Sequence, residues 1–386
     1  MTPAARVSAA IGVLDAWAGG QPVEQALTNW ARGARYAGSG DRAAVRDHVY
    51  DVLRCHGSCA ALGGGRTGRA LMTGLMRLQG VDPAAVFTGE GHAPAPLSGA
   101  EASHDLPPPG PEVDLPDWMR PALAERAGDR LDALLEAMRR RAPVWLRVNT
   151  RRATPEAAIA RLAEDGIAAR ADDRGARALE VTSGARRVKS SSAYLEGWVE
   201  VQDLSAQRAV EAVDWPAAGR ILDYCAGGGG KALAIAALGE ATVLAHDANP
   251  ARMRDLPARA ARAGVVIRQL AHGDLPGAAP FDAVLCDVPC SGSGTWRRDP
   301  EAKWRLTPAR LAELEVLQAE ILADASALVA PGGRLVYMTC SLFTSENEAQ
   351  VDRFLASHPG WSCLQARADT PLAASDGFFH AVFALR

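Results

Sequence analysis

The stretch that decides the fold is Arg220–Lys231, which reads RILDYCAGGGGK. Its first residues form a short apolar run typical of a buried strand, and four successive glycines follow at Gly227–Gly230. Glycine lets the chain turn sharply and approach a ligand closely, because no Cβ stands in the way. A helix is expected to begin after the loop, so that its first amides face a carboxylate or phosphate. The sequence therefore predicts a loop that binds a nucleoside-containing cofactor.

Short apolar runs alternate with helical patterns along the rest of the C-terminal half. Besides the strand at 220–224, strands are predicted at 241–247, 265–270, 281–287 and 333–339. Strands that are buried on both faces and separated by helices are typical of a doubly wound parallel sheet. We therefore predict an α/β, Rossmann-like fold that binds its ligands at the carboxyl ends of the strands.

Two acidic residues follow the second and third predicted strands. Asp247 comes about twenty residues after the loop, where an acid accepts hydrogen bonds from ribose hydroxyls. Asp274 follows the third strand, where an acid can accept a hydrogen bond from an adenine amino group. These residues do not choose the cofactor, because Gly227, Gly229 and Ala232 also satisfy the dinucleotide pattern. A dehydrogenase remains an alternative on this evidence.

Two cysteines follow the fourth and fifth predicted strands, in DVPCS at 287–291 and in TCS at 339–341. Carbon 5 of cytosine is too weak a nucleophile to take a methyl group from a sulfonium, but a thiolate that adds to carbon 6 activates it. Asp287 is placed to give the ring nitrogen a hydrogen bond as charge develops, and a second thiol can assist the elimination. The residues alone do not decide which cysteine attacks.

With these motifs the chain resembles the RsmB/Sun family of RNA cytosine-5 methyltransferases. In that family the Thr-Cys-Ser cysteine is the nucleophile and the Asp-x-Pro-Cys cysteine aids release, which implies these roles for Cys340 and Cys290. The resemblance implies RNA as the substrate and S-adenosylmethionine as the cofactor. The catalytic residues that it implies are Cys340, Cys290 and Asp287. The cofactor-binding residues that it implies are Cys225, Ala226, Gly227, Gly228, Gly229, Gly230, Lys231, Asp247, Asp274 and Asp287.

Two positions depart from the family pattern. Gly227-Gly228 stands where the family usually has Ala-Pro, which makes the loop more flexible. Arg259 stands where the family usually has an asparagine. Within the loop, Lys231 is expected to contact either the cofactor carboxylate or the base.

The segment after Cys290 holds the candidates for RNA binding, which are Arg297, Arg298, Lys303 and Trp304. The alternative for them is a salt-bridged surface loop with a buried tryptophan. The target cytosine must be unstacked, because a base within an A-form helix hides both faces of its ring.

The rest of the chain is expected to form three further parts. Residues 1–80 have helical periodicity and loosely resemble a NusB-like RNA-binding domain, and residues 81–117 are a linker rich in Pro and Gly. Residues 118–196 are a helical connector and a small α+β module, in which Thr154 and Pro155 mark a helix start. Residues 197–386 form the methyltransferase domain. The all-helical N-terminal domain favours small-subunit ribosomal RNA over transfer RNA as the substrate.

The composition is that of a globular protein. The 386 residues carry a net charge of −3, so there is no overall basic field to indicate nucleic acid. No signal peptide and no run of eighteen apolar residues is found, which favours a cytoplasmic protein without a membrane partner. The seven cysteines match neither a disulfide framework nor paired metal ligands, so we expect reduced thiols and no metal. No apolar stripe calls for a dimer, and a monomer is expected.

Three other functions compete with this interpretation. A dehydrogenase would leave both cysteine motifs without a role. A DNA cytosine-5 methyltransferase would use the Pro-Cys cysteine as its nucleophile and would have no use for Cys340. A catalytically silent RNA-binding protein would not need the full set of acids and thiols that the reaction requires.

Overall fold

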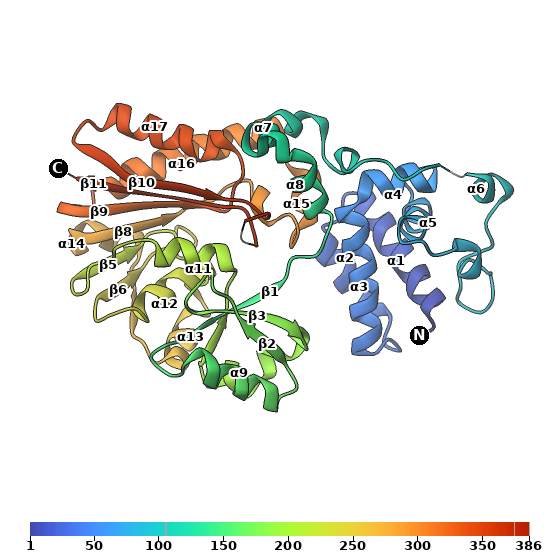
Figure 1. Ribbon diagram of the computed structural model, residues 1–386, viewed down its shortest axis with the longest axis horizontal. Coiled ribbons are helices and arrows are strands. Elements are labelled where there is room, and N and C mark those ends of the chain that lie inside the picture. The colour runs from blue at the N-terminus through green and yellow to red at the C-terminus, as the bar shows by residue number, and fades with distance from the viewer. Residues whose placement is uncertain (105, 374, 386) are drawn as a thin grey trace. The chain divides into compact units, whose positions relative to one another are not determined.

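The computed structural model describes residues 1–104, 106–373 and 375–385, which form two compact units (Figure 1). Unit 1 comprises Met1–Arg141 and Trp296–Arg305, and unit 2 comprises Ala142–Thr295 and Leu306–Arg386. The chain therefore leaves unit 2 after Thr295, adds a short segment to unit 1, and returns to unit 2 at Leu306.

Unit 1 is built from helices that pack around an aliphatic core. The helix α1 begins after Thr2, whose side chain accepts a hydrogen bond from the backbone amide of Ala5 and so caps the first turn. Leu14, Val49 and Leu71 are among the buried side chains of the core. The helices are α1 (Pro3–Ala18), α2 (Val23–Gly33), α3 (Ser39–Arg54), α4 (His56–Gly63), α5 (Gly68–Leu78), α6 (Gly99–Ser103), α7 (Arg120–Ala127), α8 (Leu131–Met138) and α15 (Pro300–Arg305).

The first part of unit 2 is a four-stranded antiparallel sheet in the order β2-β3-β1-β4. Its elements are β1 (Val144–Val148), α9 (Pro155–Glu164), β2 (Ala168–Ala171), β3 (Ala178–Ser183), α10 (Ser192–Leu195) and β4 (Val199–Val201). The predicted start of α9 is confirmed, because the Thr154 side chain accepts a hydrogen bond from the amide of Ala157 and Pro155 is the first helical residue. Leu146, Leu162 and Leu179 share one core between helix and sheet.

The second part of unit 2 is a seven-stranded sheet in the order β10-β11-β9-β8-β5-β6-β7. The five strands from β9 to β7 are parallel, which confirms the predicted α/β fold class, and β11 is antiparallel both to β9 and to its other neighbour, β10. The strands are β5 (Arg220–Asp223), β6 (Thr242–Ala245), β7 (Ile267–Gln269), β8 (Phe281–Asp287), β9 (Val329–Thr339), β10 (Trp361–Asp369) and β11 (Phe378–Leu385).

Helices cover both faces of this sheet (Figure 1). Successive residues of β9 point to opposite faces, so Val336 packs with α11 and α12 whereas Leu335 packs with α16 and α17. The helices are α11 (Leu204–Glu211), α12 (Gly230–Ala236), α13 (Leu256–Ala263), α14 (Leu275–Ala278), α16 (Pro308–Ser326) and α17 (Glu348–Ser357). Within the described ranges, no helix is both long enough and apolar enough to cross a bilayer.

The strands β10 and β11 were not predicted from the sequence. β11 reads FFHAVFAL and is buried along most of its length, because it lies between β9 and β10 and is covered on both faces. A short, continuously apolar run has neither the alternation of a half-buried strand nor the spacing of an amphipathic helix. Its period therefore does not show which element it forms.

Candidate active site

The glycine loop follows β5 and leads directly into α12. Gly227 and Gly229 have φ angles of 51° and 78°, in the left-handed region that side chains other than glycine rarely adopt. A Cβ at position 229 would also lie 2.2 Å from Cδ1 of Leu256. The amide of Gly227 donates a hydrogen bond of 2.9 Å to Oδ2 of Asp247, which ties the loop to the end of β6. Glycine is thus required by the backbone at two positions of this loop.

Asp223 ends β5 beneath the glycine loop and is only 1% exposed. Neither of its carboxylate oxygens has a hydrogen-bond partner among the described residues. Burial and the charge of Asp287 together raise the pKa of Asp223 to about 7, although the charge of Lys231 opposes the shift. A buried carboxyl without donors is costly, so this position favours a ligand that brings a donor or a positive charge.

The two other acids proposed for the cofactor lie at the carboxyl ends of neighbouring strands. Asp247 is buried, and its Oδ1 accepts a hydrogen bond of 2.9 Å from the amide of Asn249. Arg252 makes an ion pair of 3.2 Å with Oδ2 of Asp247. Asp274 is exposed in the short helix η7 (His272–Asp274), which follows β7. The adjacency of β5, β6 and β7 brings both acids to the same edge as the glycine loop.

The two departures from the family pattern contact each other. Nη1 of Arg259, on α13, donates a hydrogen bond to the carbonyl oxygen of Gly228. Nη2 of the same guanidinium lies 3.3 Å from Oε1 of Glu200, the middle residue of β4. Arg259 therefore holds the backbone of the loop where the sequence makes it most flexible. From the sequence, Arg259 could be recognised only as a departure from the family pattern. Its contact with Gly228 could not be predicted, because the spacing between the two residues indicates no contact.

Lys231, the residue after the glycines, pairs with Asp287 at the end of β8. Nζ of Lys231 lies 2.5 Å from Oδ2 of Asp287 and 5.1 Å from the centre of the Phe378 ring. Burial lowers the pKa of Lys231, but the carboxylates of Asp287 and Asp223 and the thiol of Cys340 raise it, and the net shift is upward. Lys231 is therefore a stable cation within the group of catalytic candidates.

Cys290 and Cys340 meet at the ends of the adjacent parallel strands β8 and β9, as their positions predicted. Their Sγ atoms are 3.4 Å apart, and both residues are half-buried. The hydrogen bond with Cys340 and burial raise the pKa of Cys290 well above its ordinary value. Two thiolates at this distance would repel each other, so the two thiols do not ionise together.

A buried carboxyl, which the sequence did not reveal, holds the two cysteine loops together. Glu346 lies in the turn before α17 and accepts hydrogen bonds from both the amide and the hydroxyl of Ser291, at 2.7 and 2.5 Å. It also accepts hydrogen bonds from the hydroxyl of Ser341 and from the Gln318 amide, the latter at 2.9 Å. Since Ser291 and Ser341 each follow a cysteine, Glu346 fixes the loops that carry Cys290 and Cys340. The only feature of the sequence that could have indicated this network is the serine that follows each cysteine.

The four residues proposed to hold RNA belong to unit 1, and the side chains of three of them donate hydrogen bonds to backbone carbonyls there. Lys303 is 3% exposed, and its Nζ donates a hydrogen bond of 3.2 Å to the carbonyl of Arg54. Nε1 of Trp304 donates a hydrogen bond of 2.7 Å to the carbonyl of Leu53. These contacts favour a structural role for Lys303 and Trp304, because donors that are bound to buried carbonyls are not available to a nucleic acid. Arg297 and Arg298 are half-exposed, and the Arg297 guanidinium donates hydrogen bonds to the carbonyls of Arg140 and Arg141 at 3.2 and 3.1 Å.

Two family models match the chain. Residues 212–382 match the model described as 16S rRNA methyltransferase RsmB/F. Residues 115–187 match the ferredoxin-like domain of RsmF/B-like methyltransferases, which includes β1, β2 and β3.

Curated relatives and solved structures agree with these matches. Ribosomal RNA small subunit methyltransferase B of Klebsiella pneumoniae is 34% identical over 69% of this chain, and that of Xanthomonas campestris is 37% identical over 62%. The chain spans 65% and 56% of the lengths of these relatives. The structure of PH0851 is 24% identical, covers 99% of both chains and has a TM-score of 0.79. NSun6 from Pyrococcus horikoshii, solved with SFG, is 17% identical, covers 70% of this chain and 98% of its own, and has a TM-score of 0.62.

The parallel-dominated sheet with its glycine loop defines a Rossmann-like methyltransferase fold. The cysteine motifs, the family models and the curated relatives place the chain more narrowly. It belongs to the RsmB/F methyltransferase family, as the resemblance of its motifs indicated.

Proposed function

We propose that this protein methylates carbon 5 of a cytosine in RNA, with S-adenosylmethionine as the cofactor and small-subunit ribosomal RNA as the substrate. The observation that carries the proposal is the pair of thiols 3.4 Å apart beside the ion pair of Lys231 and Asp287. The names of the curated relatives support ribosomal RNA over the alternative, transfer RNA. Its proposed place of action is the cytoplasm, and its proposed state is a monomer.

The residues of the loop fit S-adenosylmethionine. Gly227 and Gly229 leave room where a Cβ would stand, and the buried carboxyl of Asp223 lacks a donor that a cationic ligand supplies. The loop from Cys225 to Lys231, together with Asp247, Asp274 and Asp287, would hold the cofactor. When bound, it supplies an electrophilic methyl group on a positively charged sulfur, which carbon 5 of the activated base takes.

Cys340 is the proposed nucleophile. Its thiolate forms a bond to carbon 6, and the electrons of the ring double bond move toward carbon 5 and the ring nitrogen. Asp287 is the proposed partner of that nitrogen, and Lys231 keeps a positive charge beside the sulfur and the carboxylate. When the proton on carbon 5 passes to a water molecule, its electron pair restores the double bond, the carbon–sulfur bond breaks and Cys340 leaves as a thiolate.

Cys290 is the proposed release partner. Its pKa is raised, so it remains a thiol that can donate to Cys340 as the carbon–sulfur bond breaks and the thiolate reappears. The assignment of the attack to Cys340 and of the release to Cys290 rests on the family resemblance.

The roles of the two cysteines are tested with RNA and a radiolabelled cofactor. We expect Cys340→Ala to abolish transfer of the methyl group to RNA. Cys290→Ala is expected to accumulate a covalent protein–RNA adduct that survives a denaturing gel. Cys363→Ala, a change on β10 outside the site, is the matched control and should retain activity. Near-normal methylation by Cys340→Ala would refute the nucleophile, and absence of the adduct would refute the release role.

The substrate is tested separately by bisulfite sequencing of RNA from cells that lack this protein. We expect one cytosine of small-subunit ribosomal RNA to lose its methyl group. Loss of methylation from transfer RNA alone would favour the alternative substrate. An unchanged pattern, together with an inactive purified protein that still binds RNA, would favour the catalytically silent alternative.

A further inference from the structure

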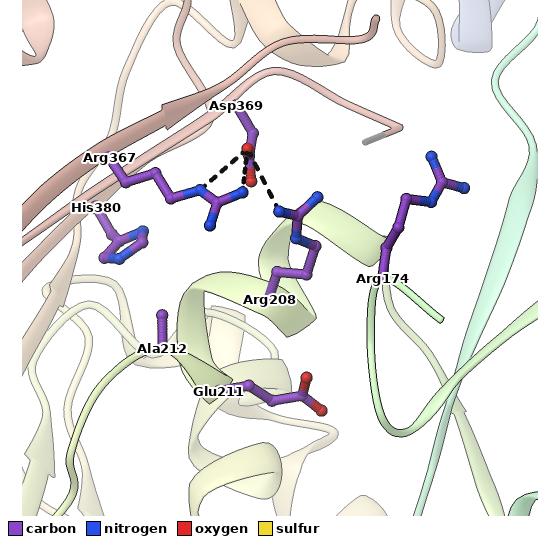
Figure 2. A pocket seen from close by; sticks show the side chains of 7 residues that line it. All are labelled: Arg174, Arg208, Glu211, Ala212, Arg367, Asp369 and His380. Atoms are coloured by element: carbon purple, nitrogen blue, oxygen red, sulfur yellow. Dashed lines mark hydrogen bonds and ion pairs between the residues drawn. The ribbon is translucent and has the colours of Figure 1, made fainter. Parts of the chain in front are cut away.

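A polar cavity lies within unit 2, on the face of the large sheet that α11 covers (Figure 2). Its volume is about 260 Å³. Three separate parts of unit 2 line it: the turn between β2 and β3, the helix α11, and the antiparallel strands β10 and β11. The lining residues are Arg174, Arg208, Glu211, Ala212, Arg367, Asp369 and His380. The lining therefore has three guanidinium groups and only two carboxyl groups.

Arg208 has more hydrogen-bond donors than partners. Its side chain is 17% exposed, and its one ion pair in the described part of the chain joins Nη2 to Oδ1 of Asp369 at 3.8 Å. That distance is too long for a hydrogen bond. A guanidinium has five N–H donors, so this ion pair leaves donors of Arg208 available within the cavity. An anionic ligand in the cavity would satisfy them.

Asp369 sets the arrangement of the other groups. Its Oδ1 accepts hydrogen bonds from Nε and Nη2 of Arg367, at 3.2 and 3.1 Å, and so holds Arg367 beside Arg208 (Figure 2). Burial lowers the pKa of the neighbouring His380, so its imidazole adds no positive charge at neutral pH. Burial also raises the pKa of Glu211, the second carboxyl of the lining. The two guanidiniums Arg208 and Arg367 are thus the groups best arranged to bind an anion.

The cavity is close to the proposed catalytic centre. Asp369 pairs directly with Phe378 in the register of β10 and β11. The ring of Phe378 lies under the ammonium of Lys231, with Nζ 5.1 Å from the ring centre. The cavity and Lys231 are therefore connected through the neighbouring residues Asp369 and Phe378.

We propose that this cavity binds a phosphate group, and that in the working protein this phosphate belongs to the backbone of the RNA whose cytosine enters the catalytic site. The RNA part of this inference rests on the proposed function. Guanidinium groups match the geometry of phosphate oxygens and bind them with two parallel hydrogen bonds. Contacts of this kind position a nucleic acid without reading its sequence.

The first test measures binding of the substrate RNA to the full-length protein at several salt concentrations. Arg208→Gln is expected to raise the Kd about tenfold. Losing one phosphate contact should also make the dependence of log Kd on log salt shallower by about 0.7. In methylation assays the KM for RNA should rise while kcat is unchanged, because the contact exists before and during the reaction. Arg208→Lys keeps the positive charge but cannot make two parallel hydrogen bonds to a phosphate, and it should give an intermediate Kd.

Arg310→Gln is the matched control. Arg310 lies on α16, which covers the opposite face of the sheet, and its guanidinium is exposed and paired with Glu313. The change removes the same charge from the protein but should leave both the Kd and its salt dependence unchanged. An equal loss in Arg208→Gln and Arg310→Gln would show a general effect of charge and would overturn the inference.

The second test uses inorganic phosphate and the thermal unfolding of the same proteins without RNA. Phosphate should raise the Tm of the wild type and of Arg310→Gln, but not that of Arg208→Gln. If this holds while the Kd for RNA does not change, the cavity binds free phosphate and the RNA part of the inference is wrong. If neither phosphate nor RNA distinguishes Arg208→Gln, the whole inference is wrong. If the wild type does not bind RNA, the proposed function fails, whereas the phosphate test still decides the cavity.

Discussion

Arg259 and Gly228 show how two unusual residues compensate for each other. A glycine in place of the proline of the family pattern at 228 gives the loop more freedom, and that freedom must be lost when a ligand is bound. The hydrogen bond from Arg259 to the Gly228 carbonyl removes part of that freedom before binding. Gly228 also leaves the space for this contact, because a Cβ there would lie 2.9 Å from Nη1 of Arg259.

We expect Arg259→Asn to weaken cofactor binding about tenfold, because one hydrogen bond from a charged donor to the loop is lost. Isothermal titration of the apoprotein with S-adenosylmethionine measures the effect. Arg254→Asn, a change at an exposed residue close by, is the matched control and should bind like the wild type. Equal affinity of Arg259→Asn and the wild type would contradict the stabilising role.

Asp223 predicts a dependence of stability on pH in the absence of cofactor. Its pKa is about 7 in the folded protein against 3.8 ordinarily, so the folded state binds more protons than the unfolded state between about pH 4 and 7. The free energy of unfolding should therefore fall as the pH rises through this window. Asp223→Asn cannot ionise, and above pH 7 it should be more stable than the wild type by roughly 2–4 kcal/mol.

Urea unfolding at several pH values tests this prediction for Asp223. The two proteins should have similar free energies of unfolding near pH 4 and should diverge toward pH 7. Asp255→Asn, at an exposed position, should follow the wild type throughout. If the free energies of unfolding of Asp223→Asn and the wild type changed with pH in the same way, the pKa of Asp223 would not be raised by burial.

At the scale of elements, the parallel strands and their loops were predictable because each signal is local. A short apolar run followed by Gly, Asp or Cys marks a buried strand and its carboxyl end, as at Asp223 and Asp287. The contacts of Glu346 and Arg259 were not predictable, because each joins segments that are far apart in the chain. The pairing of β10 and β11 was missed for the same reason, since it depends on partners rather than on a pattern.

The turn that carries Glu346 connects the loops after β8 and β9. We expect Glu346→Gln to lower the free energy of unfolding by about 2–4 kcal/mol, because its amide cannot accept all the hydrogen bonds that now reach the carboxyl. It should also lower kcat about tenfold through displacement of the cysteines. The cofactor Kd should not change, because the glycine loop does not contact Glu346.

Urea unfolding, methylation kinetics and cofactor titration of Glu346→Gln separate these effects. Glu313→Gln on α16 removes an exposed carboxyl and should behave like the wild type in all three. If Glu346→Gln kept the wild-type kcat despite a lower stability, Glu346 would support the fold without positioning the cysteines.

At the scale of the whole molecule, the segment Trp296–Arg305 is part of unit 1 although it lies between two strands of unit 2 in the sequence. We expect Trp304→Ala to lower the free energy of unfolding by about 2–4 kcal/mol, because it removes a largely packed ring and a hydrogen bond to Leu53. Chemical unfolding followed by circular dichroism measures the loss. Tyr36→Ala removes an exposed aromatic ring from the same unit and should have little effect.

The outcome for Trp304→Ala also decides between the two interpretations of the segment. A variant that is as stable as the wild type but binds RNA more weakly would restore Trp304 as an RNA contact. A loss of stability without a direct effect on RNA affinity at low temperature would assign the ring to the fold. The sequence alone could not separate these, because an aromatic residue between basic residues is common to both.

The return of the chain to unit 1 affects the order in which the protein folds during synthesis. The helix α15 and its buried Lys303 leave the ribosome only after residues 142–295 have been made. Unit 1 therefore lacks its last segment while β1 through β8 are synthesised, although N-terminal domains commonly fold first. During that interval the carbonyls of Leu53 and Arg54 lack the donors that they later bind. Nascent chains stalled before and after residue 305 should therefore differ in the resistance of the N-terminal helices to protease.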